Sequence, residues 1–194
     1  MTRLPMISDQ NASLAAQSLL EATRRQLGRV PNLYRAMANS PIALGGYLAF
    51  RQALVADGAE LDPPMRERVA LLTAQMNGCG YCVAAHSFRG GKVGLSLEEL
   101  ALNRQARSAE PRVAAALQFA KEAIEMQGDV SDATLAMVRG AGWSDAALSE
   151  IIAHVALNMF SNLFNHVARP DLDFPAVEMT APRAELPAWA ECRR

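Results

Sequence analysis

The sequence of 194 residues has little net charge, few cysteines and no long apolar run. A formal net charge of −1 provides no basic surface for nucleic acid or for an anionic membrane, so we expect neither as a partner. No stretch approaches about 18 consecutive apolar residues, and the N-terminal residues have no signal-peptide apolar core. We therefore expect a cytoplasmic protein without a membrane span.

Cysteine is scarce, with only Cys79, Cys82 and Cys192 in the chain. An odd and small number excludes the disulfide framework of a small secreted domain. Cys79 and Cys82 form one C-x-x-C pair, which in a reducing compartment is typical of a catalytic or metal-binding site. Cys192 lies within the last three residues, and we expect it to be a tail thiol without a role.

Alternating runs of β-branched residues are also absent, so the sequence predicts an all-α fold. Alanine supplies about 36 residues, and other strong helix formers supply many more. Capping residues, prolines and glycines predict helices over about 12–28, 31–40, 42–57, 62–77, 79–91, from 96, 111–127, 131–140 and 144–167. We expect one domain over residues 1–194, with a short N-terminal arm and a loop-like tail from about residue 170.

The chain contains a weak internal sequence similarity, which we call the echo. A shift of 83 positions aligns Glu67 with Glu150, and it aligns the two cysteines of the C-x-x-C pair with Asn162 and Asn165. Either a helical hairpin unit was duplicated, or alanine-rich helices match by chance. The sequence leaves both explanations open.

The residues suited to chemistry lie between Glu67 and His86. Cys79, Cys82 and His86 have the spacing that shares one helix face, and the break at Gly78 places Cys79 at a helix N-terminus that favours a thiolate. A chain reversal at Gly78 brings Glu67 within about one helical turn of His86. This arrangement predicts a relay from Glu67 through His86 to Cys82, with Cys79 able to resolve a sulfenic acid into a disulfide.

Metal binding is a weaker interpretation of the same cysteines. Zinc needs two further ligands, and the only histidines, His86, His154 and His166, are poorly spaced for it. We therefore expect no metal and no cofactor. His154 and His166 are expected to be core or interface histidines, and Arg66 and Arg68 to form exposed or interfacial ion pairs.

The pattern Glu67-x11-Cys79-x-x-Cys82-x3-His86 resembles the signature of the AhpD-like alkylhydroperoxidases, within the carboxymuconolactone decarboxylase superfamily. The main resemblance covers about residues 62–95. The flanking segments Val30-Pro31-Asn32-Leu33, Phe164-Asn165-His166 and Asp173-Phe174-Pro175 resemble the branch of peroxidase-related proteins.

The resemblance implies an AhpD-like helical bundle and a thiol peroxidase that forms homo-oligomers. Its substrate would be a small hydroperoxide, and its reductant a dithiol or a protein. Cys82 would be the peroxidatic nucleophile, Cys79 the resolving thiol, and Glu67 and His86 the proton relay. The best-known members have a second histidine where this chain has Tyr81, which can donate a hydrogen bond but is no base near neutral pH.

Two other functions remain open at this point. Decarboxylase-like members of the superfamily act on a lactone acid and do not need the thiol pair. A non-enzymatic disulfide redox sensor, or a helical zinc module, would use the cysteines without turnover.

Overall fold

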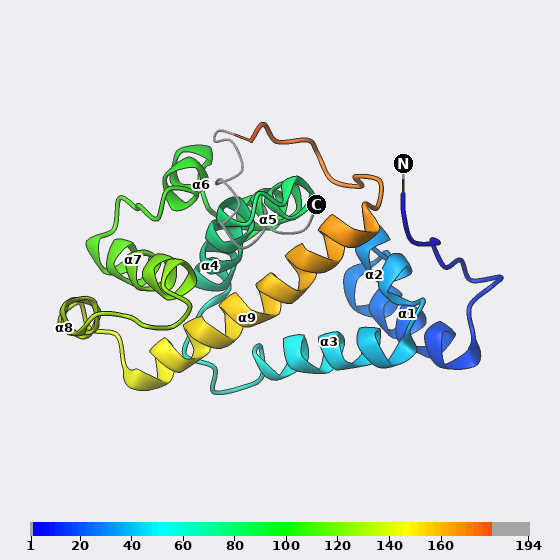
Figure 1. The fold of residues 1–194 in the computed structure, drawn as a ribbon, viewed down its shortest axis with the longest axis horizontal. Helices are drawn as coiled ribbons and strands as arrows, with labels where there is room; N and C mark the ends of the chain where they lie inside the picture. The colour runs from blue at the N-terminus through cyan, green and yellow to red at the C-terminus, as the bar shows by residue number, and fades with distance from the viewer. Residues whose placement is uncertain (1, 180–194) are drawn as a thin grey trace, which may run out of the picture.

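The computed structural model describes residues 2–179, and this part of the chain folds into helices joined by loops (Figure 1). The helices are α1 (Leu14–Leu27), α2 (Asn32–Met37), α3 (Pro41–Ala53), α4 (Pro63–Met76), α5 (Gly80–Lys92), α6 (Leu97–Asn103), α7 (Pro111–Glu125), α8 (Asp132–Gly140) and α9 (Asp145–Ala168). The predicted all-α class is confirmed.

The helices begin where the sequence predicts because their start signals are local. Six of them have an N-cap side chain that accepts a hydrogen bond from a backbone N–H of the first turn: Ser13, Ser40, Asp62, Ser96, Ser131 and Ser144. The largest difference is at the end of α3, which stops at Ala53, before the predicted end at residue 57.

Helix α9 is the central element, with α4 and α7 packed on one side of it and α2 and α3 on the other (Figure 1). On one side α4, α7 and α8 form a core with α9 that includes Leu117 and Ile151. On the other side α1, α2 and α3 form a second core with the C-terminal half of α9, including Leu20, Tyr34 and Leu157. The C-terminal half of α9 also faces the α4–α5 hairpin, because Asn165 contacts Cys82 and His166 contacts Asn77.

By length and composition α9 could cross a membrane, but half of its most apolar window is buried within the protein. The core helices of globular proteins pass the same test, so this is weak evidence for a membrane span.

The α4–α5 hairpin carries the C-x-x-C pair. Its turn depends on Gly78, whose φ of 64° lies in the left-handed region that glycine adopts without strain. Helix α5 begins immediately afterwards, with Cys79 as its N-cap. In the segment that the 83-residue echo aligns with this hairpin, α9 continues as one helix through Asn162 and Asn165. Duplication of a hairpin unit stays a prediction.

After α9 the chain runs without helix through residues 170–179, which we call the strap. Asp173 of the strap accepts hydrogen bonds from the Tyr81 hydroxyl and from the backbone N–H of Asn32. Arg104 donates to the carbonyl of Glu178 near the other end of the strap, at 2.8 Å. The strap thus lies against the start of α5, where the cysteines are.

Candidate active site

Both cysteines of the C-x-x-C pair are free and buried, with 2% of Cys79 and 3% of Cys82 exposed. A hydrogen bond from the Cys82 thiol lowers the pKa of Cys79, and the backbone N–H groups of Tyr81 and Cys82 lower it further. These N–H groups belong to the first turn of α5, which is the part of a helix that stabilises a negative charge. Cys79 is therefore the more acidic thiol of the pair.

Cys82 has a different environment. Burial raises the pKa of its thiol, and so does the neighbouring Cys79. Asn165 of α9 opposes this effect, because its Nδ2 donates a hydrogen bond to the Cys82 Sγ at 3.1 Å. An amide donor aimed at the sulfur stabilises a thiolate when the proton leaves.

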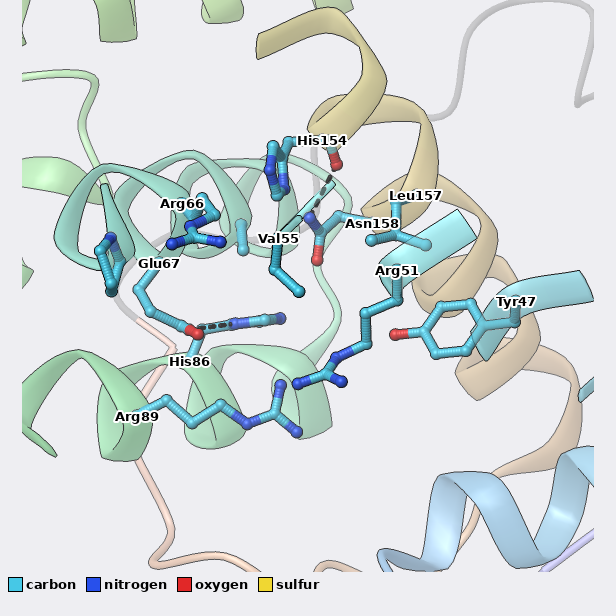
Figure 2. Close-up of a pocket in the computed structure, with 12 residues that line it drawn as sticks. Tyr47, Arg51, Val55, Arg66, Glu67, His86, Arg89, His154, Leu157 and Asn158 are labelled. Atoms are coloured by element: carbon cyan, nitrogen blue, oxygen red, sulfur yellow. Dashed lines mark hydrogen bonds and ion pairs between the residues drawn. The ribbon is translucent and has the colours of Figure 1, made fainter. Parts of the chain in front are cut away.

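Glu67 of α4 and His86 of α5 face each other across the hairpin, with 2.7 Å between Glu67 Oε2 and His86 Nδ1 (Figure 2). Burial raises the pKa of Glu67, but His86, Arg89 and Arg51 outweigh it and hold the pKa below its usual value. A carboxylate only accepts, so Nδ1 carries the proton and Nε2 is the nitrogen that can accept another.

Two hollows meet at His86. The inner cavity has a volume of about 20 Å³ and is lined by Cys82, Tyr34, Tyr81 and Phe174, among others. That volume holds about one water-sized group. The outer pocket has a volume of about 300 Å³ and contains Glu67 and the other side chains drawn in Figure 2. His86 lines both hollows, together with Tyr47 and Arg89.

Only one of the two cysteines reaches the inner cavity. Cys82 lines it and Cys79 does not. Both belong to a small apolar cluster with Leu71 and Leu100, against which the strap residues Val177 and Met179 pack. Within residues 2–179 no hydrogen bond joins Cys82 to His86. A proton therefore has to pass between them through a group that lies inside the cavity.

Tyr81 is a tether rather than a member of the relay. Its hydroxyl donates to Asp173 Oδ1 at 2.5 Å and accepts from the backbone N–H of Leu33 at 3.3 Å. Burial and the bond to Asp173 raise the pKa of Tyr81 far above neutral pH. The side chain therefore joins α5 to α2 and to the strap as a neutral phenol.

Removing this tether in Tyr81→Phe is expected to reduce the free energy of unfolding by about 1–2 kcal/mol, the usual cost of losing a part-buried hydrogen bond to a charged group. Cys79 should also react faster with a thiol reagent because the strap above it is held less firmly. Denaturant unfolding and alkylation rates measure the two effects. Asp173→Asn alone and combined with Tyr81→Phe forms a double-mutant cycle, and additive effects would contradict the tether.

The two remaining histidines have unlike surroundings. His166 Nε2 lies 2.9 Å from the carbonyl oxygen of Asn77 and connects α9 to the hairpin turn. His154 is 5% exposed and lines the outer pocket, and its Nε2 has no hydrogen-bond partner within the described residues. Burial, followed by the charge of Arg66, lowers the pKa of His154 to about 4, so the ring is neutral near pH 7.

The buried His154 should make the protein sensitive to mild acid. An unfolded histidine takes up a proton below about pH 6.5, whereas folded His154 does so only near pH 4. Folding stability should therefore fall by about 2 kcal/mol between pH 7 and pH 5 through this group alone. Urea unfolding of His154→Gln should lack this part of the decline, and equal declines in the variant and the unmodified protein would contradict the assignment.

Sequence reasoning missed several residues of the site and misplaced one. The asparagines of α9 had no assigned role, although the echo aligns Cys82 with Asn165, which the structure brings into contact. Arg68 is buried rather than exposed, because it pairs with Glu110 at 2.8 Å and lies 3.5 Å from Glu99. Cys192 lies outside the described residues. Within residues 2–179, no three His, Cys, Asp or Glu side chains are grouped as metal ligands.

Comparisons with known proteins agree with this arrangement. The model of the carboxymuconolactone decarboxylase family matches residues 41–122, which include the hairpin and the relay residues. No curated protein sequence matches the chain.

Solved structures share the fold over nearly the whole chain. A peroxidase-related protein from Ralstonia eutropha JMP134, described as an alkylhydroperoxidase AhpD core, is 25% identical, with a TM-score of 0.77 over 88% of this chain and 92% of its own. A peroxidase-related protein from Silicibacter sp. TM1040 is 22% identical, with a TM-score of 0.74 over 88% and 91%. The debrominase Bmp8 is 16% identical, with a TM-score of 0.74 over 89% and 93%.

Proposed function

Because this chain belongs to the AhpD-like group of the carboxymuconolactone decarboxylase superfamily, we propose that it is a thiol-dependent peroxidase that reduces small hydroperoxides. The observation that carries the proposal is the inner cavity, which has the Cys82 thiol on one wall and His86 on another. His86 is itself bonded to the ionised Glu67. A nucleophile, a base and a group that orients the base thus surround a water-sized space, which the terminal oxygen of a hydroperoxide can enter.

In the first step the terminal oxygen of a hydroperoxide enters the inner cavity, and the Cys82 thiol loses its proton to His86 Nε2. The Cys82 sulfur then attacks the distal peroxide oxygen, the O–O bond breaks, and sulfenic acid and alkoxide form. The alkoxide takes the proton from His86 and leaves as the alcohol. Glu67 stabilises the transient charge on the ring, and Asn165 stabilises the Cys82 thiolate.

In the second step the Cys79 thiolate attacks the sulfur of the Cys82 sulfenic acid. Hydroxide leaves, takes a proton from solvent as water, and a Cys79–Cys82 disulfide remains. The lowered pKa of Cys79 suits it to this step because its thiol gives up a proton more readily than an ordinary thiol. An external dithiol or protein thiol then reduces the disulfide and closes the cycle.

The test is consumption of cumene hydroperoxide with dithiothreitol as the reductant. We expect catalytic turnover by the unmodified protein and by Cys192→Ser, the matched control for the third thiol, and none by Cys79→Ser/Cys82→Ser. Equal consumption by the double variant would overturn the proposal. Turnover of a muconolactone-type acid by that double variant would instead favour the decarboxylase-like function.

A further inference from the structure

Three arginines line the outer pocket, and their charge is not matched by the acidic groups around them. From this imbalance we propose that the outer pocket is an anion subsite that binds a carboxylate on the substrate. The substrate class would then be organic hydroperoxides that also bear a carboxylate. This inference rests on the proposed peroxidase function for the reaction, but the binding of the carboxylate can be tested without it.

The arginines come from three different helices and converge on one space. Arg51 belongs to α3, Arg66 to α4 and Arg89 to α5, and all three line the outer pocket. Figure 2 shows the guanidinium groups of Arg51 and Arg89 extended toward each other, with Arg66 beside Glu67. Two facing cations repel each other unless an anion lies between or beside them.

The positive charges that line the outer pocket outnumber the negative ones, which favours the binding of an anion. Among the described residues, Glu67 is the only acidic side chain that lines it, and its carboxylate is already bonded to His86. Within residues 2–179, none of the three guanidinium groups has a carboxylate oxygen within 4.0 Å.

The partners that the arginines do have are neutral. In the described part of the chain, Arg51 reaches only the side-chain oxygen of Gln26, at 3.5 Å, and Arg89 lies 5.8 Å from the ring centre of Phe174. Burying guanidinium groups with such weak partners costs desolvation free energy. An anion that binds here can therefore pair with them without first displacing another carboxylate.

His154 gives a second, independent sign of a ligand in the same pocket. The side chain is almost completely buried, lines the pocket and leaves its Nε2 without a partner in the described part of the chain. Buried polar atoms normally have a hydrogen-bond partner. A polar ligand in the outer pocket would provide one.

The size and position of the pocket fit a carboxylate-bearing hydroperoxide. Its volume of about 300 Å³ can accept an aromatic acid, and the guanidinium fork matches the two oxygens of a carboxylate. Because His86 and Arg89 line both hollows, a ligand whose carboxylate is held in the outer pocket can direct its peroxide group toward Cys82. Glu67 in the same pocket disfavours ligands of higher negative charge.

The first experiment compares cumene hydroperoxide with its para-carboxylate derivative, which differs only by the charged group. For the unmodified protein we expect kcat/KM for the carboxylate to be at least about tenfold higher. Arg51→Gln should reduce this ratio by about tenfold, Arg51→Lys should restore part of it, and Arg25→Gln, an exposed arginine of α1, should leave it unchanged. A ratio near one in the unmodified protein would overturn the inference.

The second experiment separates the subsite from the reaction. Calorimetry would measure binding of 4-isopropylbenzoate, with 4-isopropylbenzamide as the neutral control, to the unmodified protein and to Cys79→Ser/Cys82→Ser. Binding of the benzoate alone, lost in Arg51→Gln, supports the subsite even if no peroxide is consumed. Peroxide turnover without benzoate binding overturns the subsite and leaves the peroxidase. A change of oligomeric state in Arg51→Gln without benzoate binding would assign the arginines to a subunit interface and also overturn it.

Discussion

Replacing Cys82 by serine is expected to reduce peroxide consumption by at least about 10³-fold, because the variant has no nucleophile on the inner cavity. Serine keeps the size of the side chain, and its hydroxyl can accept the same Asn165 hydrogen bond that the sulfur accepts. The fold should therefore persist, which circular dichroism can check. Stopped-flow measurement of peroxide loss, with the enzyme in excess, gives the rate.

Cys79→Ser should behave differently although it also removes one thiol of the pair. Cys82 can still react once with the peroxide, but no thiolate is present to form the disulfide. We expect one equivalent of peroxide to be consumed rapidly, with a sulfenic acid on Cys82 that mass spectrometry detects after trapping with dimedone. Steady turnover should be lost unless the added reductant attacks the sulfenic acid directly.

The two variants together decide which sulfur meets the peroxide. The lowered pKa of Cys79 favours Cys79 as the nucleophile, whereas access to the inner cavity favours Cys82 in that role. We give priority to access because Cys82 lines the inner cavity together with His86, whereas Cys79 does not. A rapid first reaction in Cys82→Ser, with trapped sulfenic acid on Cys79, would reverse the assignment.

The second large effect is expected from Glu67→Gln, which should lower kcat/KM for hydroperoxide by about 10²-fold. The amide keeps the shape of the side chain and can still approach His86, but it has no charge to stabilise the protonated ring. Because His86, Arg89 and Arg51 outweigh burial and hold the Glu67 pKa below its usual value, the carboxylate is ionised above pH 5. The loss should therefore be present at every pH between 5 and 8.

The control for Glu67→Gln is Glu98→Gln, which removes the same charge from an exposed position of α6 outside the site. This variant should keep the unmodified kcat/KM. Titration of the free thiols should give the same count in both variants. If Glu67→Gln retained full activity across this pH range, the carboxylate would have no part in the relay, and its contact with His86 would be structural.

The local features of this protein could be predicted from its sequence. Helix starts depend on residues next to one another, such as Asp62 before Pro63 and Pro64, and so the order of the helices follows from capping and propensity. The relay follows as well, because Gly78 reverses the chain and brings Glu67 and His86 together across one hairpin.

What only the tertiary structure decided is how distant helices meet. The sequence identifies Cys79 and Cys82, but only the packing of the helices and the strap shows that Cys82 lines the inner cavity and Cys79 does not. Asn165 reaches Cys82 across 83 positions of sequence, and the arginines of the outer pocket come from three separate helices. Such contacts depend on the angles and rotations at which whole helices pack, and these are set by the sum of many side-chain contacts rather than by any local pattern.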